Sequence, residues 1–171
     1  MRDAKKLIGI LGGIGSGKTA VAELFARHGC RVIHADRIVH ELIEQPEIRH
    51  RIVSEFGSDV ADDQGGILRS RLAEKAFTNE QSVQRINRIL HPPVLATTDR
   101  LIAEYSRDPA VPAIVLDVPL LVETGWHERC DVLVFVAVDE AVRARRAEKR
   151  GLSFENQVRK REKFQISLDK K

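Results

Sequence analysis

Short apolar runs at four places along the chain predict buried β-strands. They cover residues 7–11, 31–34, 113–116 and 131–138. The last run is almost continuously apolar, which is typical of a parallel strand with both faces covered. Apolar residues at helical spacing follow the first run and predict a helix over 18–28, and a basic helix is predicted over 140–150 after the last run. Strands that alternate with helices predict an α/β fold, a three-layer α/β/α core with a parallel sheet.

The stretch between residues 37 and 106 has the pattern of helices only. Pro46 stands where a helix would begin, and an apolar stripe at helical spacing continues from there to Gly57. Residues 91–93 (His-Pro-Pro) are predicted to break the helical pattern. The predicted helices of this stretch are 37–44, 46–56, 68–77, 82–90 and 94–106. The chain is thus predicted to be one domain, 1–171, with a core of 1–36 and 107–142 and a helical insertion over 37–106.

A glycine-rich segment between the first strand and the first helix carries the strongest chemical signal. Residues 12–19 read GGIGSGKT, which fits the phosphate-binding loop G-x-x-x-x-G-K-[ST]. Its backbone N–H groups can surround a polyphosphate, Lys18 can reach the β- and γ-phosphates, and the Thr19 hydroxyl can bind Mg²⁺. The alternative is a strand–helix turn with a chance lysine. The candidate ATP-binding residues are Gly13, Ile14, Gly15, Ser16, Gly17, Lys18, Thr19 and Ala20.

Acidic residues follow two of the predicted strands, at the end where parallel sheets bind ligands. Asp36 comes shortly after the second strand and could accept the proton of an attacking hydroxyl. It could equally be the N-cap of a helix that starts at Arg37. Asp117 ends the third strand and is a candidate for supporting Mg²⁺, partly through water, with a capping or turn role as the alternative. Glu123 lies six residues further on.

The segment 143–161 is dense in lysine and arginine and is interrupted at Gly151. Two helices are predicted here, one ending near Arg150 and a last one over 154–164. Such a basic pair with a glycine joint favours a lid that closes over a polyphosphate, because its like charges would gain little by packing onto the core alone. The alternative is a fixed, solvated basic surface.

Composition excludes several classes of function. The 171 residues are 43% hydrophobic and 31% charged with a net charge of +3, which mildly favours anionic substrates without requiring nucleic acid. Few aromatic residues are available to stack on bases. Cys30 and Cys130 have no metal-ligand spacing and suggest a reduced, cytoplasmic setting. No apolar run has the length of a membrane span and no signal peptide is evident at the N-terminus, so no membrane partner is expected.

The order of several motifs resembles the dephospho-coenzyme A kinase family over nearly the whole chain. These motifs are GGIGSGKT at 12–19, HAD at 34–36, EFG at 55–57, the segment from Arg69 through Leu72 to Phe77, LHP at 90–92, DVPLLVE at 117–123, GLS at 151–153, and Arg161 with Gln165. The phosphate loop is generic, whereas the remaining set in this order is far more specific.

The resemblance implies that ATP phosphorylates the ribose 3′-hydroxyl of dephospho-coenzyme A, with Mg²⁺ as cofactor, in a monomer or weak homo-oligomer. It implies Asp36 as the catalytic base, assisted by Lys18 and the lid residues Arg145 and Arg150, with Arg161 on ATP. The implied substrate contacts are Asp36, Arg69, His91, Asp117 and Glu123, and the implied metal contacts are Thr19 and Asp117. Two alternatives stay open: another small-molecule kinase of this fold, or a non-catalytic nucleotide-binding switch.

The sequence departs from the family pattern at four places. His34 stands where the family has the first acid of DAD, and Ala20 where it commonly has a hydroxyl residue. The lid arginine of the family falls on Lys149, with Arg150 beside it, and lysine cannot make the same bidentate contact with phosphate. The family also has a last strand and helix beyond the position of Lys171, so the sheet is expected to lack an edge strand here.

Overall fold

The computed structural model describes residues 5–119, 121–149, 151, 153 and 158–162. The chain divides into two compact units. Unit 1 comprises Met1–Ala35 and Arg100–Lys171, and unit 2 comprises Asp36–Asp99. Among the described residues, no helix is both long and apolar enough to span a lipid bilayer.

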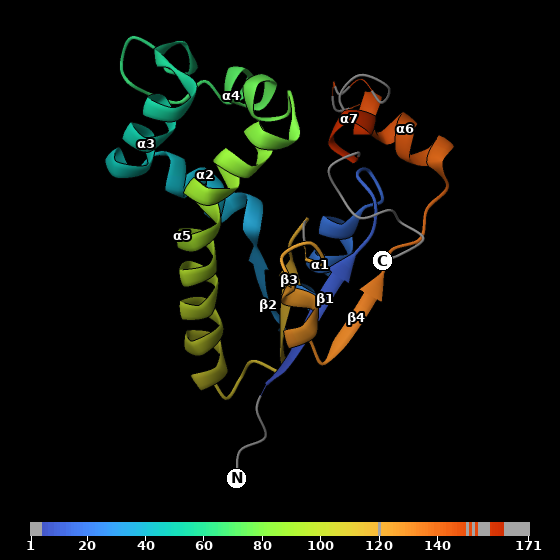
Figure 1. The fold of residues 1–171 in the computed structure, drawn as a ribbon. Helices are drawn as coiled ribbons and strands as arrows, with labels where there is room; N and C mark the ends of the chain where they lie inside the picture. Colours follow the sequence, from blue (N-terminus) through green and yellow to red (C-terminus); the bar gives the residue numbers. More distant parts are fainter. Residues whose placement is uncertain (1–4, 120, 150, 152, 154–157, 163–171) are drawn as a thin grey trace. The chain divides into compact units, whose positions relative to one another are not determined.

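Unit 1 is built on a parallel sheet of four strands, in the order β2-β3-β1-β4 (Figure 1). The strands are β1 (Lys6–Leu11), β2 (Arg31–His34), β3 (Ala113–Asp117) and β4 (Val132–Phe135). Every residue of β3 is buried, as its apolar sequence requires. The register pairs His34 with Asp117, so the second and third strands end side by side. This arrangement confirms the predicted α/β fold with a parallel sheet.

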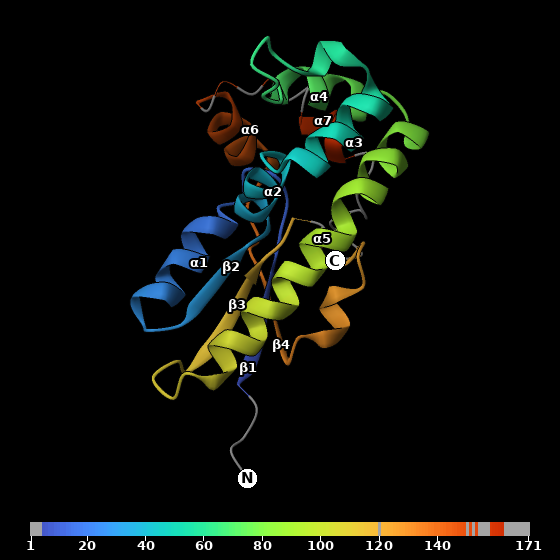
Figure 2. The same cartoon turned by 90° about the vertical axis from the view of Figure 1, so that its left-hand side faces the viewer.

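Helix α1 (Lys18–Arg27) connects β1 to β2 and packs on the sheet (Figure 2). The contact is apolar: Ile10, Ala22 and Val115 are fully buried, and Phe25 packs against them. The helix is followed by Gly29 at φ +86°, a conformation that glycine adopts without strain, and the chain then turns directly into β2. The phosphate-loop segment is therefore held between a central strand and a helix that is anchored along the sheet.

Strand β4 differs from its prediction. The apolar run predicted a strand over 131–138 with both faces covered, but β4 spans only Val132–Phe135 and is an edge strand among the described residues. Val132, Leu133 and Phe135 are 44–47% exposed. The pattern alone cannot tell a strand covered on both faces from an edge strand, because both carry apolar side chains on successive residues. The start of β4 is held by Asp131, which accepts hydrogen bonds from the backbone N–H of Leu7 and the Lys6 ammonium.

Unit 2 is helical apart from one isolated bridge between Ala61 and Ile67. It contains α3 (Pro46–Phe56), the 3₁₀ turn η1 (Ser58–Val60), α4 (Arg69–Ala76), nearly all of α2 (Ala35–Ile43) and most of α5 (Glu80–Arg107). Pro46 begins α3 and Gly57 ends it, as predicted. The buried core of this unit is the cluster Ile43, Ile48, Ile52, Phe56, Val60, Ile67, Leu72, Ala76, Ile86 and Ile89.

The predicted helix break at residues 91–93 is wrong. Helix α5 runs without interruption for 28 residues and carries Pro92 and Pro93 inside it. Proline in a helix interior removes a backbone hydrogen bond and costs about 3 kcal/mol. The helix persists because buried side chains anchor it on both sides of the prolines, Ile86 and Ile89 before them and Thr98 after them. Tertiary packing thus overrides the local signal.

Three short elements complete the described part of unit 1. They are η2 (Trp126–Arg129), α6 (Glu140–Glu148) and α7 (Arg159–Glu162). Helix α6 agrees with the predicted helix over 140–150 except at its C-terminal end. Most of the predicted last helix, 154–164, lies outside the described residues.

Candidate active site

The loop Gly12–Thr19 joins β1 to α1 and has the backbone of an anion-binding turn. Gly15 and Gly17 lie at φ +80° and +98°, where an L side chain would be strained. A Cβ atom on Gly12 would approach the Ser16 Oγ to 2.7 Å, and one on Gly15 would approach the Arg143 carbonyl oxygen to 2.8 Å. The loop therefore needs glycine both for its conformation and for the space that its neighbours leave.

Lys18 lies folded over the start of this loop. Its ammonium donates hydrogen bonds to the carbonyl oxygens of Gly12 and Gly13, each at 2.9 Å. Close by in the sequence, the Ser16 Oγ is buried and has no hydrogen-bond partner in the described part of the chain. A buried polar group normally has a partner. A bound phosphate oxygen would supply one, so the loop fits the nucleotide phosphates that its sequence predicts.

Asp117, at the end of β3, connects the loop helix to the neighbouring strand. Its Oδ2 accepts a hydrogen bond from the Thr19 hydroxyl at 2.9 Å and lies 3.1 Å from the His34 Nδ1. Asp117 is 8% exposed, so its carboxylate is stabilised by these two neighbours rather than by bulk water. The sequence predicted Thr19 and Asp117 each as a metal contact, and the structure brings the two side chains into contact.

His34 and Glu23 extend this cluster beyond the predicted residues. The His34 ring is 10% exposed, and its Nε2 lies 3.5 Å from the Glu23 Oε1. From the sequence, His34 was interpreted only as a missing carboxylate, and Glu23 was not predicted to belong to the site. Two signals could have found Glu23: it lies one helical turn after Thr19 on α1, and α1 packs on the strand that ends at His34.

The pair Thr19 and Asp117 fits Mg²⁺ better than it fits a transition metal. Both offer oxygen atoms, which Mg²⁺ prefers, and Mg²⁺ is usually held by one or two protein oxygens together with substrate phosphates and water. Within the described ranges, no three His, Cys, Asp or Glu side chains are grouped to hold a metal by themselves. The donor set thus agrees with a metal that arrives with the nucleotide.

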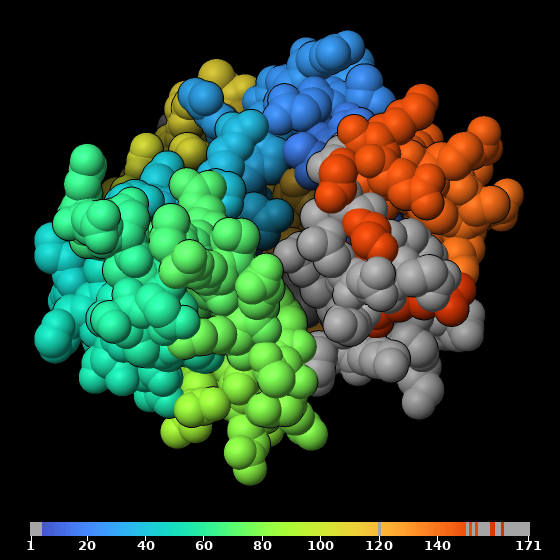
Figure 3. All heavy atoms as spheres, turned by 90° about the horizontal axis from the view of Figure 1, so that it is seen from above, coloured from blue at the N-terminus to red at the C-terminus, as the bar shows by residue number. Residues whose placement is uncertain are grey.

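The basic helix α6 packs directly on the phosphate loop (Figure 3). Arg143 is only 4% exposed; it donates to the Ile14 carbonyl oxygen at 3.3 Å and forms a 2.6 Å ion pair with Glu162. Glu162 also accepts the Ile14 N–H at 3.3 Å, and Arg146 donates to the Ser16 carbonyl oxygen at 2.9 Å.

These contacts correct the prediction that the basic charges of residues 143–161 gain little by packing onto the core. For Arg143 the Glu162 carboxylate compensates the buried charge, and the Ile14 carbonyl oxygen accepts a further hydrogen bond. Arg145, predicted to be catalytic, is exposed on the same helix. Arg150 and the side chain of Arg161 lie outside the described residues, although the backbone of Arg161 belongs to α7.

The other predicted residues lie at separate places in the two units. In unit 1, Glu123 is half-buried in the turn region between β3 and η2, and Ala20 is exposed on α1. In unit 2, Arg69 is exposed at the first position of α4. His91 is half-buried inside α5, and burial lowers the pKa of its ring below the usual value, so the ring is neutral near pH 7.

Asp36 is exposed and lies in the first turn of α2, two residues after β2 ends. Because α2 begins at Ala35, the alternative that Asp36 is the N-cap of a helix starting at Arg37 is wrong. A carboxylate in the first turn still interacts favourably with the helix dipole. An exposed carboxylate at this position is compatible with a role of Asp36 as proton acceptor.

The parallel sheet carries a phosphate-binding loop between β1 and α1. An aspartate at the end of a neighbouring strand contacts the threonine of this loop. These features define a P-loop nucleotide-binding protein. Comparison with known proteins narrows this class. The family model for dephospho-CoA kinase matches residues 6–171. The chain belongs to the dephospho-CoA kinase family, and the resemblance identified from its motifs is confirmed.

Individual relatives agree with this assignment. The chain is 38% identical over 165 residues to the dephospho-CoA kinase of Corynebacterium glutamicum, covering 95% of this chain and 81% of that protein. It is 40% identical over 167 residues to the dephospho-CoA kinase of Thermobifida fusca, covering 96% of this chain and 81% of that protein. A crystal structure of a Thermus thermophilus protein superposes with a TM-score of 0.77 at 32% identity, covering 98% of this chain and 84% of that chain.

Proposed function

We propose that this protein transfers the γ-phosphoryl group of ATP to the ribose 3′-hydroxyl of dephospho-coenzyme A, giving coenzyme A and ADP. The observation that carries the proposal is the loop Gly12–Thr19 with its Thr19–Asp117 contact, in a chain that belongs to the dephospho-CoA kinase family. The test is incubation with ATP, Mg²⁺ and dephospho-coenzyme A, with coenzyme A detected by mass. Phosphorylation of a nucleoside or nucleotide instead, or nucleotide binding without transfer to any alcohol, would contradict it.

In this proposal each site residue has a separate role in the reaction. The Asp36 carboxylate accepts the proton of the 3′-hydroxyl. The oxygen of that hydroxyl bonds to the γ-phosphorus, and the bond from this phosphorus to the ADP oxygen breaks. Lys18 balances charge on the β- and γ-phosphates, and Gly13–Ala20 hold them through backbone and hydroxyl groups. Arg69, neutral His91, Asp117 and Glu123 contact the acceptor. Arg145 and Arg150 stabilise the charge on the moving phosphoryl group, and Arg161 contacts ATP.

Mg²⁺ is the proposed cofactor, and when bound it neutralises charge on the β- and γ-phosphate oxygens. The Thr19 hydroxyl would bind it, and Asp117 would support it partly through a water molecule. The chemistry of both groups suits this ion. The His34 ring, 3.1 Å from Asp117, would keep that carboxylate in the orientation that the Thr19 hydroxyl also requires.

Replacing Asp117 with asparagine is expected to raise the Mg²⁺ concentration needed for half-maximal rate about 10- to 100-fold, the usual effect of losing a group that orients a metal's ligands. The amide loses the negative charge but retains the size of the side chain. The Mg²⁺ dependence of ADP affinity, measured by calorimetry, should change in the same direction. Glu104→Gln, which removes an exposed carboxylate on α5, is the matched control. Unchanged Mg²⁺ dependence in Asp117→Asn would limit Asp117 to a structural role.

The segment 143–161 is proposed to close over bound ATP. Arg145 is exposed on α6, so it can pair with phosphate oxygens, and the contacts of Arg143 and Arg146 already place α6 beside the loop. A nucleotide shifts the equilibrium between an open and a closed form of this segment only through better contacts in the closed form. Closure would also exclude water from the reacting groups.

Amide hydrogen exchange in α6 is accordingly expected to slow when a non-hydrolysable ATP analogue and Mg²⁺ are added. The residues of β3 should be protected in both states, because that strand is buried throughout. Mass spectrometry measures peptides from both α6 and β3 in each sample, with and without nucleotide. The β3 peptides therefore serve as an internal reference for exchange in α6. Equal exchange of α6 in both states would mean that its basic residues form a fixed surface.

The setting of the reaction is proposed to be the cytoplasm. Cys30 and Cys130 are both free thiols in the structure, as a reduced compartment allows. A monomer or weak homo-oligomer is proposed as the active form.

A further inference from the structure

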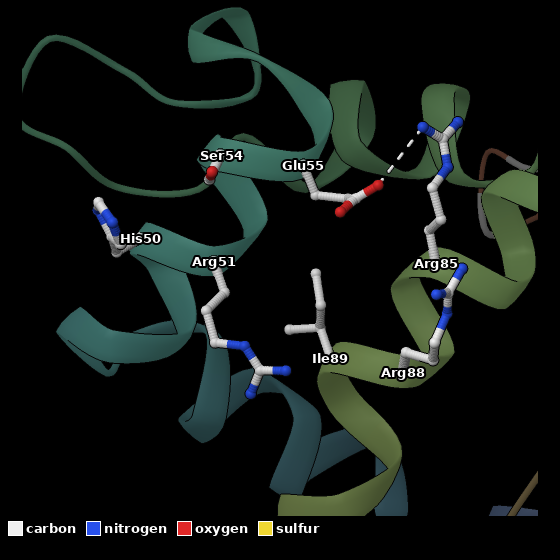
Figure 4. Close-up of a pocket in the computed structure, with 7 residues that line it drawn as sticks. All are labelled: His50, Arg51, Ser54, Glu55, Arg85, Arg88 and Ile89. Atoms are coloured by element: carbon white, nitrogen blue, oxygen red, sulfur yellow. Dashed lines mark hydrogen bonds and ion pairs between the residues drawn. The ribbon is translucent and has the colours of Figure 1, made fainter.

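A basic pocket lies within unit 2, between α3 and α5, and none of the proposed chemistry uses it. It has a volume of about 370 Å³. Its lining includes His50, Arg51 and Glu55 from α3 and Arg85, Arg88 and Ile89 from α5 (Figure 4). Three arginines and one glutamate therefore line the pocket, with the buried Ile89 side chain between the two helices.

Only one of the three arginines has its charge compensated. The Arg85 Nη1 lies 3.4 Å from the Glu55 carboxylate, its Nη2 donates to the Ser82 Oγ at 3.0 Å, and the group lies over the Phe56 ring. Arg51 and Arg88 are exposed and form no hydrogen bond or ion pair with any other described residue. The pocket thus keeps two uncompensated positive charges, one from each helix.

Further donor capacity exists at the same place. The Arg85 Nε is buried and has no hydrogen-bond partner among the described residues. A buried donor without a partner is uncommon in native proteins, and a ligand oxygen or water normally satisfies it. The uncompensated charges of Arg51 and Arg88, one from each helix, point to an anion in the pocket.

We propose that the pocket between α3 and α5 binds the diphosphate group of a small molecule. Guanidinium groups match phosphate oxygens with two parallel hydrogen bonds, so Arg51 and Arg88 together can hold two adjacent phosphates. A diphosphate diester carries two negative charges, which equals the uncompensated charge of the pocket. A concave site with an apolar residue beside its charges suits a compact organic ligand.

This site is separate from the phosphate loop, since all its lining residues belong to unit 2. No sequence motif marks Arg51, Arg85 or Arg88, and only the packing of α3 beside α5 brings them together. The proposal does not depend on the proposed kinase reaction. The diphosphate could belong to the acceptor substrate or to a second small molecule, and the experiment separates these sources.

The test is calorimetric titration of inorganic pyrophosphate into the full chain, with the phosphate loop first saturated by a non-hydrolysable ATP analogue and excess Mg²⁺. The variant Arg51→Gln/Arg88→Gln is expected to bind pyrophosphate at least tenfold more weakly than the wild type, since it loses two charge-assisted contacts. Arg49→Gln is the matched control. It removes one guanidinium from α3, the helix of Arg51, but outside the pocket, where Arg49 donates to the Gly65 carbonyl.

A second titration uses dephospho-coenzyme A in place of pyrophosphate. An equal loss of its affinity in the double variant would assign the pocket to the acceptor's own diphosphate, whereas unchanged affinity would assign it to another diphosphate ester. Pyrophosphate binding equal to that of the wild type in the double variant and in Arg88→Gln would overturn the proposal. If no coenzyme A forms in the mass assay, the kinase proposal fails while the pyrophosphate titration keeps its meaning.

Discussion

Replacing Lys18 with alanine is expected to lower the rate of phosphoryl transfer at least about 100-fold, the usual effect of removing a group that stabilises transition-state charge. The Lys18 ammonium lies over the Gly12 and Gly13 carbonyl oxygens, at the start of the loop that would surround the phosphates. Alanine leaves the β- and γ-phosphate charge without this counter-charge. The measurement is coenzyme A formation at saturating ATP and dephospho-coenzyme A.

The control for this variant addresses folding. Lys18 is half-buried, so its replacement leaves the sheet intact, and the circular dichroism spectrum should match that of the wild type. Lys6→Ala removes an exposed ammonium that pairs with Asp131, and it should retain wild-type activity because exposed pairs contribute little. A Lys18→Ala rate within about threefold of wild type, about 0.65 kcal/mol in the barrier, would contradict the assignment of the loop.

Replacing Asp36 with asparagine is expected to reduce turnover about 10²- to 10⁴-fold while ATP affinity stays unchanged. Asparagine keeps the shape of the side chain and its place in the first turn of α2, but it cannot take the proton of the attacking hydroxyl. The two quantities are measured separately, turnover by coenzyme A formation and ATP affinity by calorimetry.

Asp63→Asn provides the matched control for Asp36. Asp63 is an exposed carboxylate of the same unit, in the loop that follows η1, and its replacement should leave turnover unchanged. Normal turnover in Asp36→Asn would show that the carboxylate only supports the start of α2. A loss of ATP affinity as large as the loss of turnover would also contradict a role confined to proton transfer.

Local signals were sufficient for the elements that depend on a few neighbouring residues. The glycines of GGIGSGKT predicted a strand–loop–helix turn because positive φ values and the absence of side chains are requirements of the backbone itself. Pro46 and Gly57 predicted both ends of α3 for the same kind of reason. The apolar runs predicted the parallel strands, although the length and exposure of β4 differ from that prediction. Thr19 and Asp117 were each predicted to contact Mg²⁺, and they meet because β1 and β3 are parallel neighbours in the sheet.

The sequence by itself determined the class of fold, the phosphate loop and the family, because these follow from local backbone requirements and from motif order. Tertiary structure decided the rest. It kept Pro92 and Pro93 inside α5, brought His34 between Glu23 and Asp117, and buried Arg143 while leaving Arg145 exposed. Each of these outcomes depends on residues far apart in the chain, whose packing and charge compensation arise only when the elements meet.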